Sequence, residues 1–290
     1  MKISEILSSK KIGISCELFP PKLGSQLDNV KEVVKEMAEI KPSYMSITYG
    51  ATGGTSEYTV DIANEIQNVN HIPALAHLTC ASSGKEKVHA VIEQLKAAGI
   101  KNILALRGDI LEGADYPVQK DYRYASELIY DVKSRGDFCI GGACYPEGHP
   151  EAKTINEDLI HLKEKVDAGC DFLTTQMFFD NNIYYNFMYK VLQKNITVPV
   201  IPGIMPVTNG GQMKKIISLS GNMAPPRFKA IVDRFSDSPA AMRQAGIAYA
   251  TEQIIDLIAN GVNHIHIYTM NKPSVAGEIF RNLSDIYIRD

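Results

Sequence analysis

The sequence predicts a (β/α)8 barrel with extra helices before its last strand. Short β-branched runs alternate with longer segments of helical period, and this alternation occurs eight times along the chain. Three of the helical segments end at a glycine that is followed directly by a strand. The sequence also lacks the GxGxxG fingerprint of a doubly wound dinucleotide-binding sheet. Eight repeats of one βα unit favour a closed barrel over an open sheet.

The eight candidate strands are short runs bounded by turn residues and by helical segments. They span 12–19, 44–49, 73–80, 102–108, 139–146, 172–179, 199–205 and 264–270. A Gly-rich stretch at 50–55 follows the second of them, but its glycines do not have the dinucleotide-binding spacing. The long interval from about 206 to 262 exceeds the length of one crossover helix, so we expect the extra helices there.

The helices carry their own start and stop signals. Capping-box patterns at 25–28, 83–86 and 154–157 would satisfy the free amides of a first helical turn. Ser238 is followed by a proline suited to the first helical position. The glycines that suit the left-handed residue after a helix are Gly99, Gly169 and Gly261.

Composition limits the class of protein. The chain has 290 residues, 45% of them hydrophobic and 22% charged, and a net charge of −3. That balance argues against a nucleic-acid partner, which requires a strongly basic surface. Neither a bilayer-spanning run nor a signal peptide is evident, so we expect a cytoplasmic protein with no membrane partner. Because no Pro- or Ser-rich linker divides the sequence, we expect residues 1–290 to form one catalytic barrel domain.

The five cysteines are scattered and contain no CxxC pair, which predicts buried, reduced thiols rather than disulfides or a zinc site. The sequence also lacks an HExxH motif and a serine nucleophile elbow. We therefore expect no metal site, and metal-assisted hydrolysis and acyl transfer are disfavoured.

Polar residues cluster where the predicted strands end, which is where barrel enzymes build their active sites. They are Glu17, Thr48, His77, Arg107, Asp109, Tyr145, Glu147, His149, Gln176, Asp180, Tyr268, Asn271 and Lys272. Their residue types and positions indicate a barrel enzyme with a polar, neutral-to-acidic pocket.

Several of these residues have a structural interpretation as well as a functional one. A functional role for Glu17 is favoured over a structural salt bridge, because a carboxylate in an apolar strand is costly to bury. His77 is equally consistent with a hydrogen-bonded core residue. Arg107 and Asp109 point to the same side of their strand, where they would either contact a ligand or pair with each other.

The last strand presents His264, His266 and Tyr268 on one face, between apolar residues on the other. We expect the tyrosine at the mouth of the barrel. The two histidines lie nearer the start of the strand, where structural roles are more common, and they are left out of the predicted site.

Nine segments at or near the strand ends occur in one order over nearly the whole chain. They are CELFPPK (16–22), SITYGA (46–51), AHLTC (76–80), ALRGD (105–109), YPEGHPEA (145–152), LKEKVDAG (162–169), TTQMFFD (174–180), IPGIMPV (201–207) and IYTMNK (267–272). In this order the segments resemble the 5,10-methylenetetrahydrofolate reductase family, in its bacterial form that consists of the catalytic domain alone. Each segment is a weak signal by itself, but nine in order are a strong one.

The resemblance implies a flavin-dependent oxidoreductase of one-carbon metabolism and methionine biosynthesis, a homo-oligomer that reduces 5,10-methylenetetrahydrofolate to 5-methyltetrahydrofolate. Hydride would pass from NADH or NADPH to FAD and then to the folate, in ping-pong order. The implied cofactor contacts are Thr48, His77, Arg107, Gly108, Asp109, Tyr124, Ala125, Tyr145, His149, Asp158 and Lys165. The implied folate contacts are Glu17, Gln176, Tyr268 and Lys272.

Glu17 and Asp109 would be the catalytic residues under this resemblance. The folate must open its five-membered ring to an iminium cation, and Glu17 would supply the proton to the departing nitrogen. Asp109, near the flavin pyrimidine, would disfavour an anionic reduced ring and stabilise the folate cation. Gln176 and Lys272 would bind the pterin and attract the glutamate tail.

The chain departs from the family pattern at three places. Gly210-Gly211 stands where the bacterial enzymes have an aromatic residue, Glu164 where an arginine is common, and Lys272 where an arginine would give a bidentate fork. The electron donor (NADH, NADPH or ferredoxin) and the choice of FAD or FMN therefore stay open. We expect no regulatory domain.

Two alternative functions stay open besides methylenetetrahydrofolate reduction. They are a pterin-binding methyltransferase barrel without redox chemistry and another flavin barrel, such as a proline dehydrogenase.

Overall fold

Nine parallel strands form one sheet in the computed structural model, which describes residues 1–21, 24–49, 57–81, 83–109, 121–211, 213 and 224–287. The strands are β1 (Gly13–Leu18), β2 (Met45–Ile47), β3 (Ala74–Thr79), β4 (Asn102–Leu106), β5 (Cys139–Cys144), β6 (Phe172–Thr175), β7 (Val200–Ile201), β8 (Gly203–Ile204) and β9 (His264–Tyr268). Their order in the sheet is β7-β6-β5-β4-β3-β2-β1-β9-β8. Each of the eight predicted strands is present, although most end earlier than expected.

The two outermost strands of this order are halves of one stretch of chain. β7 pairs with β6 and β8 pairs with β9, and only Pro202 separates the halves. Proline has no N–H to donate, so the ladder is interrupted there. The carbonyl of Pro202 still accepts from the backbone N–H of His266 at 2.9 Å. The sheet thus closes into a barrel of eight strand positions, which confirms the predicted fold class.

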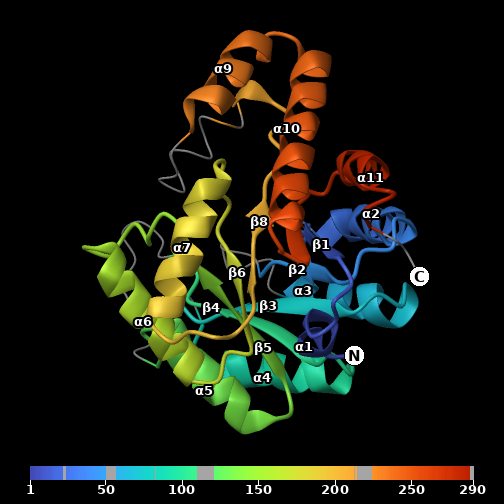
Figure 1. Ribbon diagram of the computed structural model, residues 1–290. Helices are drawn as coiled ribbons and strands as arrows, with labels where there is room; N and C mark the ends of the chain where they lie inside the picture. The colour runs from blue at the N-terminus through green and yellow to red at the C-terminus, as the bar shows by residue number, and fades with distance from the viewer. Residues whose placement is uncertain are drawn as a thin grey trace.

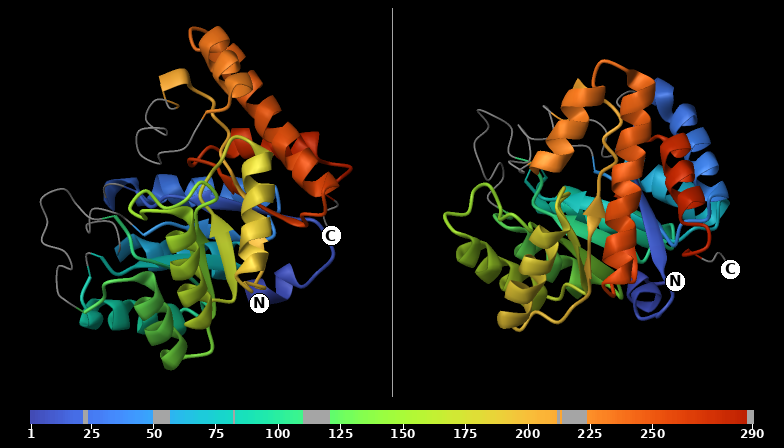
Figure 2. Two further views of the ribbon diagram at one scale, coloured as in Figure 1. Left: turned by 60° about the vertical axis from the view of Figure 1, so that its left-hand side comes forward. Right: turned by 45° about the horizontal axis from the view of Figure 1, so that its top comes forward.

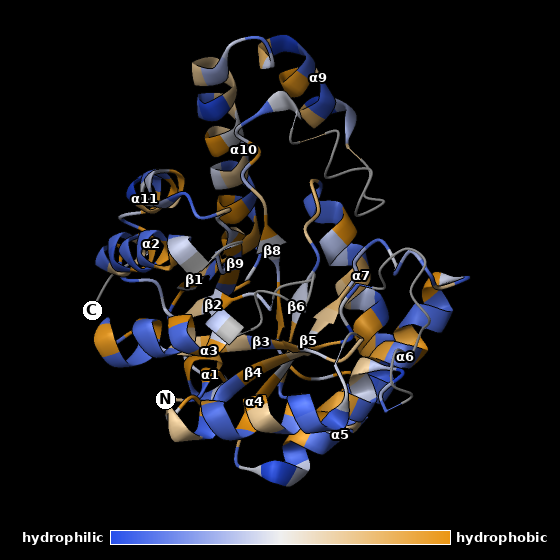
Figure 3. Cartoon of the chain, turned by 180° about the vertical axis from the view of Figure 1, so that it is seen from behind, coloured by the Kyte–Doolittle hydropathy of each residue, from blue (hydrophilic) through white to orange (hydrophobic). Residues whose placement is uncertain are grey.

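Helices surround the barrel and follow the strands in sequence (Figure 1). They are α1 (Ile3–Leu7), α2 (Leu27–Glu39), α3 (Glu57–Asn64), α4 (Lys85–Ala97), α5 (Ala125–Arg135), α6 (Ile155–Asp167), α7 (Asn181–Gln193), α9 (Pro226–Phe235), α10 (Pro239–Ala259) and α11 (Pro273–Asn282). Short helical turns occupy Gly24–Gln26 and Glu65–Val69. Figure 3 shows polar residues on the outer faces of the surrounding helices and apolar residues toward the strands. This arrangement is the expected one for amphipathic helices on a barrel.

The predicted extra helices are confirmed. α9 and the first turns of α10 project beyond the rest of the barrel as a helical pair (Figures 1 and 2). Phe228 and Val232 of α9 pack with Met205 and Val207 after β8, which ties the projection to the mouth of the barrel.

Helices begin at or within two residues of all four predicted starts, and side-chain caps are present at two of them. The hydroxyl of Thr154 accepts from the N–H of Glu157 at 3.1 Å, and the hydroxyl of Ser238 caps α10. The capping boxes predicted at 25–28 and 83–86 are wrong, since α2 and α4 have no side-chain cap. In α4 a carboxylate from a distant segment, Asp121, accepts from the N–H of Lys85 at 3.0 Å. This tertiary partner takes the place of a local cap.

The three predicted helix-ending glycines have positive φ angles, which are +71° at Gly99, +117° at Gly169 and +89° at Gly261. These left-handed residues end α4, α6 and α10 and turn the chain directly into β4, β6 and β9. The Gly-rich stretch at 50–55 lies outside the described residues.

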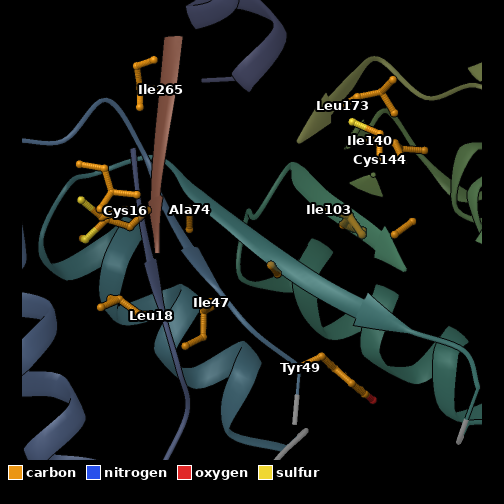
Figure 4. Packing of buried hydrophobic residues seen from close by; sticks show 14 of the residues in the cluster. Cys16, Leu18, Ile47, Tyr49, Ala74, Ile103, Ile140, Cys144, Leu173 and Ile265 are labelled. Carbon is orange, nitrogen blue, oxygen red and sulfur yellow. The ribbon is translucent and has the colours of Figure 1, made fainter. Parts of the chain in front are cut away.

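The main core lies between the strands and the helices. Outward-facing strand residues such as Cys16, Ile47, Ile103 and Leu173 pack there against the helices (Figure 4). A second cluster fills the amino-terminal end of the barrel, where Ile3 and Leu7 of α1 are buried. The opposite end is left for side chains that can contact a ligand.

The five cysteines are free and buried, as the sequence predicts. No helix in the described part of the chain is both long enough and apolar enough to cross a bilayer.

Candidate active site

A cavity of about 1510 Å³ occupies the carboxyl ends of the strands. Its lining includes residues of β1, β3, β4, β5, β6 and β9 and of α2, α5 and α6. The cavity lining contains every cofactor and folate contact implied by the resemblance except Lys272, and of the other polar strand-end residues it contains Asn271 but not Glu147 or Asp180. The ammonium of Lys272 donates instead to the hydroxyl of Thr208 at 3.1 Å, on an exposed side of the barrel mouth.

Glu17 lies in the interior of the barrel between two histidines. Its Oε2 atom is 3.5 Å from Nε2 of His77 and 3.8 Å from Nε2 of His266. The exposed fractions are 7% for Glu17, 5% for His77 and 2% for His266, so all three side chains are shielded from bulk water. Because Glu17 also lines the cavity, its carboxyl group is placed to contact a bound ligand rather than bulk water.

His266 was left out of the predicted site, and the structure places it inside. β1 pairs with β9 so that Ser15 lies opposite His266 and Glu17 opposite Tyr268. The hydroxyl of Ser15 donates to the carbonyl of Ile265 at 3.2 Å and lies 2.8 Å from Nδ1 of His266. The tautomer that fits both contacts has its proton on Nδ1, which leaves Nε2 as an acceptor on the side of Glu17.

Burial lowers the pKa of His77 to about 4, although the nearby Glu17 carboxylate acts in the opposite direction. The imidazole is therefore neutral at pH 7, and its contact with Glu17 is not an ion pair of full charges. In the described part of the chain, Nε2 of His77 and the hydroxyl of Thr174 are buried without a hydrogen-bond partner, and both residues line the cavity. Such atoms at a cavity are available to a ligand.

The ring of Tyr268 lines the cavity while its hydroxyl stabilises the barrel wall. The hydroxyl donates to the carbonyl of Thr175 at 2.6 Å, and burial raises the pKa of this phenol well above its ordinary value. Gly203 makes room for the ring, since a Cβ atom there would lie 2.5 Å from a ring carbon of Tyr268. The ring thus lines the cavity while the hydroxyl is engaged by the barrel wall.

Gln176 lines the same part of the cavity, immediately after β6. The backbone N–H of Gln176 donates to the carbonyl of Cys144 at 2.7 Å, which holds the residue beside β5. The side-chain carbonyl accepts from the N–H of Met177 at 3.0 Å. The amide nitrogen thereby becomes the group that can donate to a ligand.

The close partner of Arg107 is Glu151, whereas the sequence suggested Asp109 as the alternative to a ligand. Its guanidinium donates to both carboxylate oxygens of Glu151 at 2.6 Å, which joins the ends of β4 and β5. Gly108 between the two has φ +87°, and a Cβ atom there would lie 2.9 Å from Cβ of Thr79. Glycine is therefore required at this point both by the backbone conformation and by the close packing against Thr79, and Gly108 lines the cavity.

The wall of the cavity along β5 and α6 carries mixed charge. The ammonium of Lys165 donates to the carbonyl of Ala143 at 2.6 Å, and burial lowers its pKa. Burial raises the pKa of Asp158, with Lys165 acting against that rise. Burial lowers the pKa of His149, and Arg107 adds to the effect. Burial also raises the pKa of Tyr145 to about 12.

The far end of the cavity is formed by α5 and α6. Tyr124 and Ala125 begin α5, and the ring of Tyr124 is nearly parallel to that of His161 on α6, with 6.3 Å between centroids. His161 also contacts Glu164 at 3.1 Å between Nδ1 and Oε2. This end presents aromatic faces and a carboxylate rather than the arginine that the family pattern favours at position 164.

The residues fit a long ligand with an aromatic ring system at one end and an anionic or sugar-bearing tail at the other. The orphaned polar atoms of His77 and Thr174 belong to residues that line the cavity, and Arg107, Gly108 and Lys165 lie along its wall. The described residues contain no group of three or more His, Cys, Asp or Glu side chains suited to a metal ion.

A closed (β/α)8 barrel with a large cavity at the carboxyl ends of its strands, lined by apolar surface and by several charged and polar side chains, has the architecture typical of barrel enzymes. The family model described as methylenetetrahydrofolate reductase matches residues 2–284, nearly the whole of this sequence. The chain belongs to the methylenetetrahydrofolate reductase family.

Individual relatives agree with that assignment. "Methylenetetrahydrofolate reductase (NADH) 1" of Zea mays is 36% identical over 295 residues, which cover 97% of this chain and 50% of the maize protein. "5,10-methylenetetrahydrofolate reductase" of Escherichia coli is 33% identical over 273 residues, or 94% of this chain and 91% of that protein. The chain thus spans about half the length of its plant relatives and most of the length of its bacterial ones.

A solved structure from Clostridium thermocellum, described as binding two copies of 5-methyl-5,6,7,8-tetrahydrofolic acid, matches over the full length of both chains. The TM-score is 0.65 at 14% sequence identity, so this likeness shows the fold alone.

Proposed function

We propose that this protein is a flavin-dependent methylenetetrahydrofolate reductase that forms 5-methyltetrahydrofolate. The observation that carries the proposal is the convergence of Glu17, Gln176 and Tyr268 at one side of a cavity whose other side holds Arg107 and Lys165. A chain of this family with both sets of residues in one cavity can hold a reduced folate beside a redox cofactor.

FAD is the proposed cofactor, and it would supply two-electron transfer between a reduced nicotinamide and the folate when bound. Thr48, His77 and Asp109 would surround its ring. Its tail would follow the wall toward α5, in contact with the residues implied by the resemblance: Arg107, Gly108, Tyr124, Ala125, Tyr145, His149, Asp158 and Lys165. The cationic side chains of Arg107 and Lys165 in the cavity lining suit a phosphate-bearing tail.

Glu17 would donate the proton that opens the folate ring. Its carboxyl group lies in the barrel interior beside two imidazoles, where water competes little for that proton. The amide of Gln176 would hydrogen-bond the pterin, and the ring of Tyr268 would pack against it. Lys272, at the rim, would attract the glutamate tail of a folate without entering the cavity.

We further propose that residues 1–290 act as one catalytic domain with NADH or NADPH as the donor, and that the protein assembles as a homo-oligomer. Gly210-Gly211 follows β8 in the sequence. Because no side chain at 210 or 211 can stack on a nicotinamide, reduced ferredoxin is kept as a third donor to be tested.

The test is anaerobic reduction of purified protein with NADH, NADPH and reduced ferredoxin in parallel, monitored by flavin absorbance and followed by addition of the methylene substrate. A bound flavin that one donor reduces and that the folate reoxidises, with formation of 5-methyltetrahydrofolate, supports the proposal. Protein that binds neither FAD nor FMN and yields no methyl product with any donor would overturn it. A flavin reduced by proline but not reoxidised by the folate would favour the proline dehydrogenase alternative.

A further inference from the structure

Side chains continue the contact between β1 and β9 beyond the last backbone pair of the two strands, which is Glu17 with Tyr268. The hydroxyl of Thr269 donates to the carbonyl of Glu17 at 2.5 Å. The side-chain amide of Asn271 accepts from the N–H of Phe19 at 2.8 Å and donates to the carbonyl of Phe19 at 2.9 Å. The chain after β9 therefore holds the end of β1 through side chains, at the point where the backbone ladder has stopped.

The opposite edge of the same segment is held by β2. Leu18 pairs with Ile47, and the N–H of Thr48 donates to the carbonyl of Leu18 at 3.0 Å. Two prolines follow Phe19 and restrict the backbone further, because each fixes its own φ angle. The backbone that carries the side chain of Glu17 is thus bonded on both of its edges.

The chain after β9 takes an unusual course to bring Asn271 to this position. Met270 and Asn271 have φ angles of +53° and +54°, in the left-handed region that most L-residues avoid. Two such residues in succession, one of them a methionine, are kept only where the surrounding contacts require them. Asparagine tolerates this conformation and also supplies both bonds to Phe19. The turn and its two bonds form part of the wall of the site, since all three residues line the large cavity.

We propose that Asn271 is a positioning residue that fixes the end of β1, so that the carboxyl group of Glu17 meets the folate nitrogen that must be protonated. The inference rests on the proposed role of Glu17 as the general acid. The amide of Asn271 is bonded to Phe19, two residues after Glu17, and so acts through the backbone of β1. Proton transfer requires donor and acceptor within hydrogen-bond distance, and a misplacement of about 1 Å can lower the rate about a hundredfold.

The test uses Asn271→Gly, which removes the amide and keeps a residue suited to a positive φ angle. Reoxidation of the reduced flavin by the methylene substrate, measured by stopped-flow absorbance, should slow by about tenfold to a hundredfold. Reduction of the flavin by the electron donor should change by less than about twofold, because that step does not use the acid. Asn195→Gly is the matched control, since Asn195 also has a left-handed backbone, at φ +54°, but lies exposed after α7 and does not line the cavity.

Asn271→Gly is also combined with Glu17→Gln, so that its effect can be traced to the acid. If Asn271 acts through Glu17, the double variant should be no more than about twofold slower in flavin reoxidation than Glu17→Gln alone. Asn271→Asp repeats both comparisons if the glycine variant does not fold. Its carboxylate can accept from the N–H of Phe19 but cannot donate to the carbonyl, so it should also slow reoxidation.

Thermal unfolding of each variant separates a change in rate from a loss of folded protein. An unchanged rate of reoxidation overturns the inference, and so does equal slowing of the two half-reactions. Losses that multiply fully in the double variant also overturn it, because they would show that Asn271 acts independently of Glu17. These three outcomes leave the proposed function intact. Wild-type protein that binds no flavin and forms no methyl product overturns the proposed function and this inference together.

Discussion

Oε2 of Glu17 lies 3.5 Å from Nε2 of His77, and both side chains are buried in the barrel interior. The carboxyl group therefore faces a neutral imidazole at pH 7, since burial lowers the pKa of His77 to about 4. The contact between the proposed general acid and His77 is therefore not an ion pair of full charges.

Glu17→Gln keeps the size of the side chain and removes its transferable proton. We expect folate reduction to fall by at least about a hundredfold, which is the lower range for loss of a general acid. Oxidation of the electron donor by an artificial acceptor should be largely unchanged. The two half-reactions are measured separately by stopped-flow absorbance, and an equal loss in both would show that Glu17 is structural.

Burial of His77 makes the free energy of unfolding depend on pH, and the direction follows from its lowered pKa. The imidazole binds a proton near pH 6.5 when exposed in the unfolded chain but only near pH 4 when buried. As the pH falls from 6.5 to 4, the unfolded state takes up the proton first, and the free energy of unfolding decreases by up to about 3 kcal/mol. Urea unfolding at several pH values checks this, and His77→Gln should flatten that part of the profile.

Asp109 is exposed at the cavity and is the proposed source of negative charge near the flavin. Asp109→Asn should shift the reduction potential of the bound flavin to a more positive value, because the negative charge that opposes an electron-rich ring is removed. It should also slow folate reduction. Potentiometric titration with a reference dye measures the first effect, and an unchanged potential would remove the tuning role.

The hydroxyl of Tyr268 donates to the carbonyl of Thr175. Tyr268→Phe should lower the free energy of unfolding by about 1 kcal/mol, the usual net value of a hydrogen bond. The affinity for folate should change little, because the ring face stays in place. Chemical denaturation and substrate titration are the two measurements. A large loss of folate affinity with unchanged stability would instead assign the hydroxyl to the substrate.

Gly246 on α10 packs directly against the chain after β8. A Cβ atom there would lie 1.9 Å from the carbonyl oxygen of Val207, so the two backbones must move apart if any side chain is added. Gly246→Ala should lower the free energy of unfolding by about 1–3 kcal/mol, as overpacking does elsewhere. Gly277→Ala on α11 is the control, since the nearest atom to its Cβ would be 3.7 Å away. Thermal melts of both variants decide the comparison.

The strands and the line of polar residues at their ends could be predicted from the sequence, because alternation of β-branched and amphipathic segments is a local signal. Glu17, Arg107 and Gln176 are found for the same reason, as each follows directly from the position at which a strand ends. Their presence in one cavity follows from barrel closure and requires no knowledge of the loops.

The partners of these residues could not be predicted in the same way. His266 was placed too deep because depth depends on the stagger between the first and last strands, which the β1–β9 register sets and no local pattern reveals. The alternation of His264, His266 and Tyr268, aligned with Ser15 and Glu17, was the available signal. The bond from Arg107 to Glu151 was missed because it joins two separate βα units.

The contact between Ser15 and His266 joins residues that are 251 positions apart in the sequence. Glu17 and Tyr268 are paired across the same seam. The site around Glu17 therefore cannot form in a partly folded chain in which either the first strand or the last is not yet in place. Contacts of such long separation form late and slowly. Appearance of catalytic activity during refolding should consequently mark closure of the barrel, after most secondary structure has already formed.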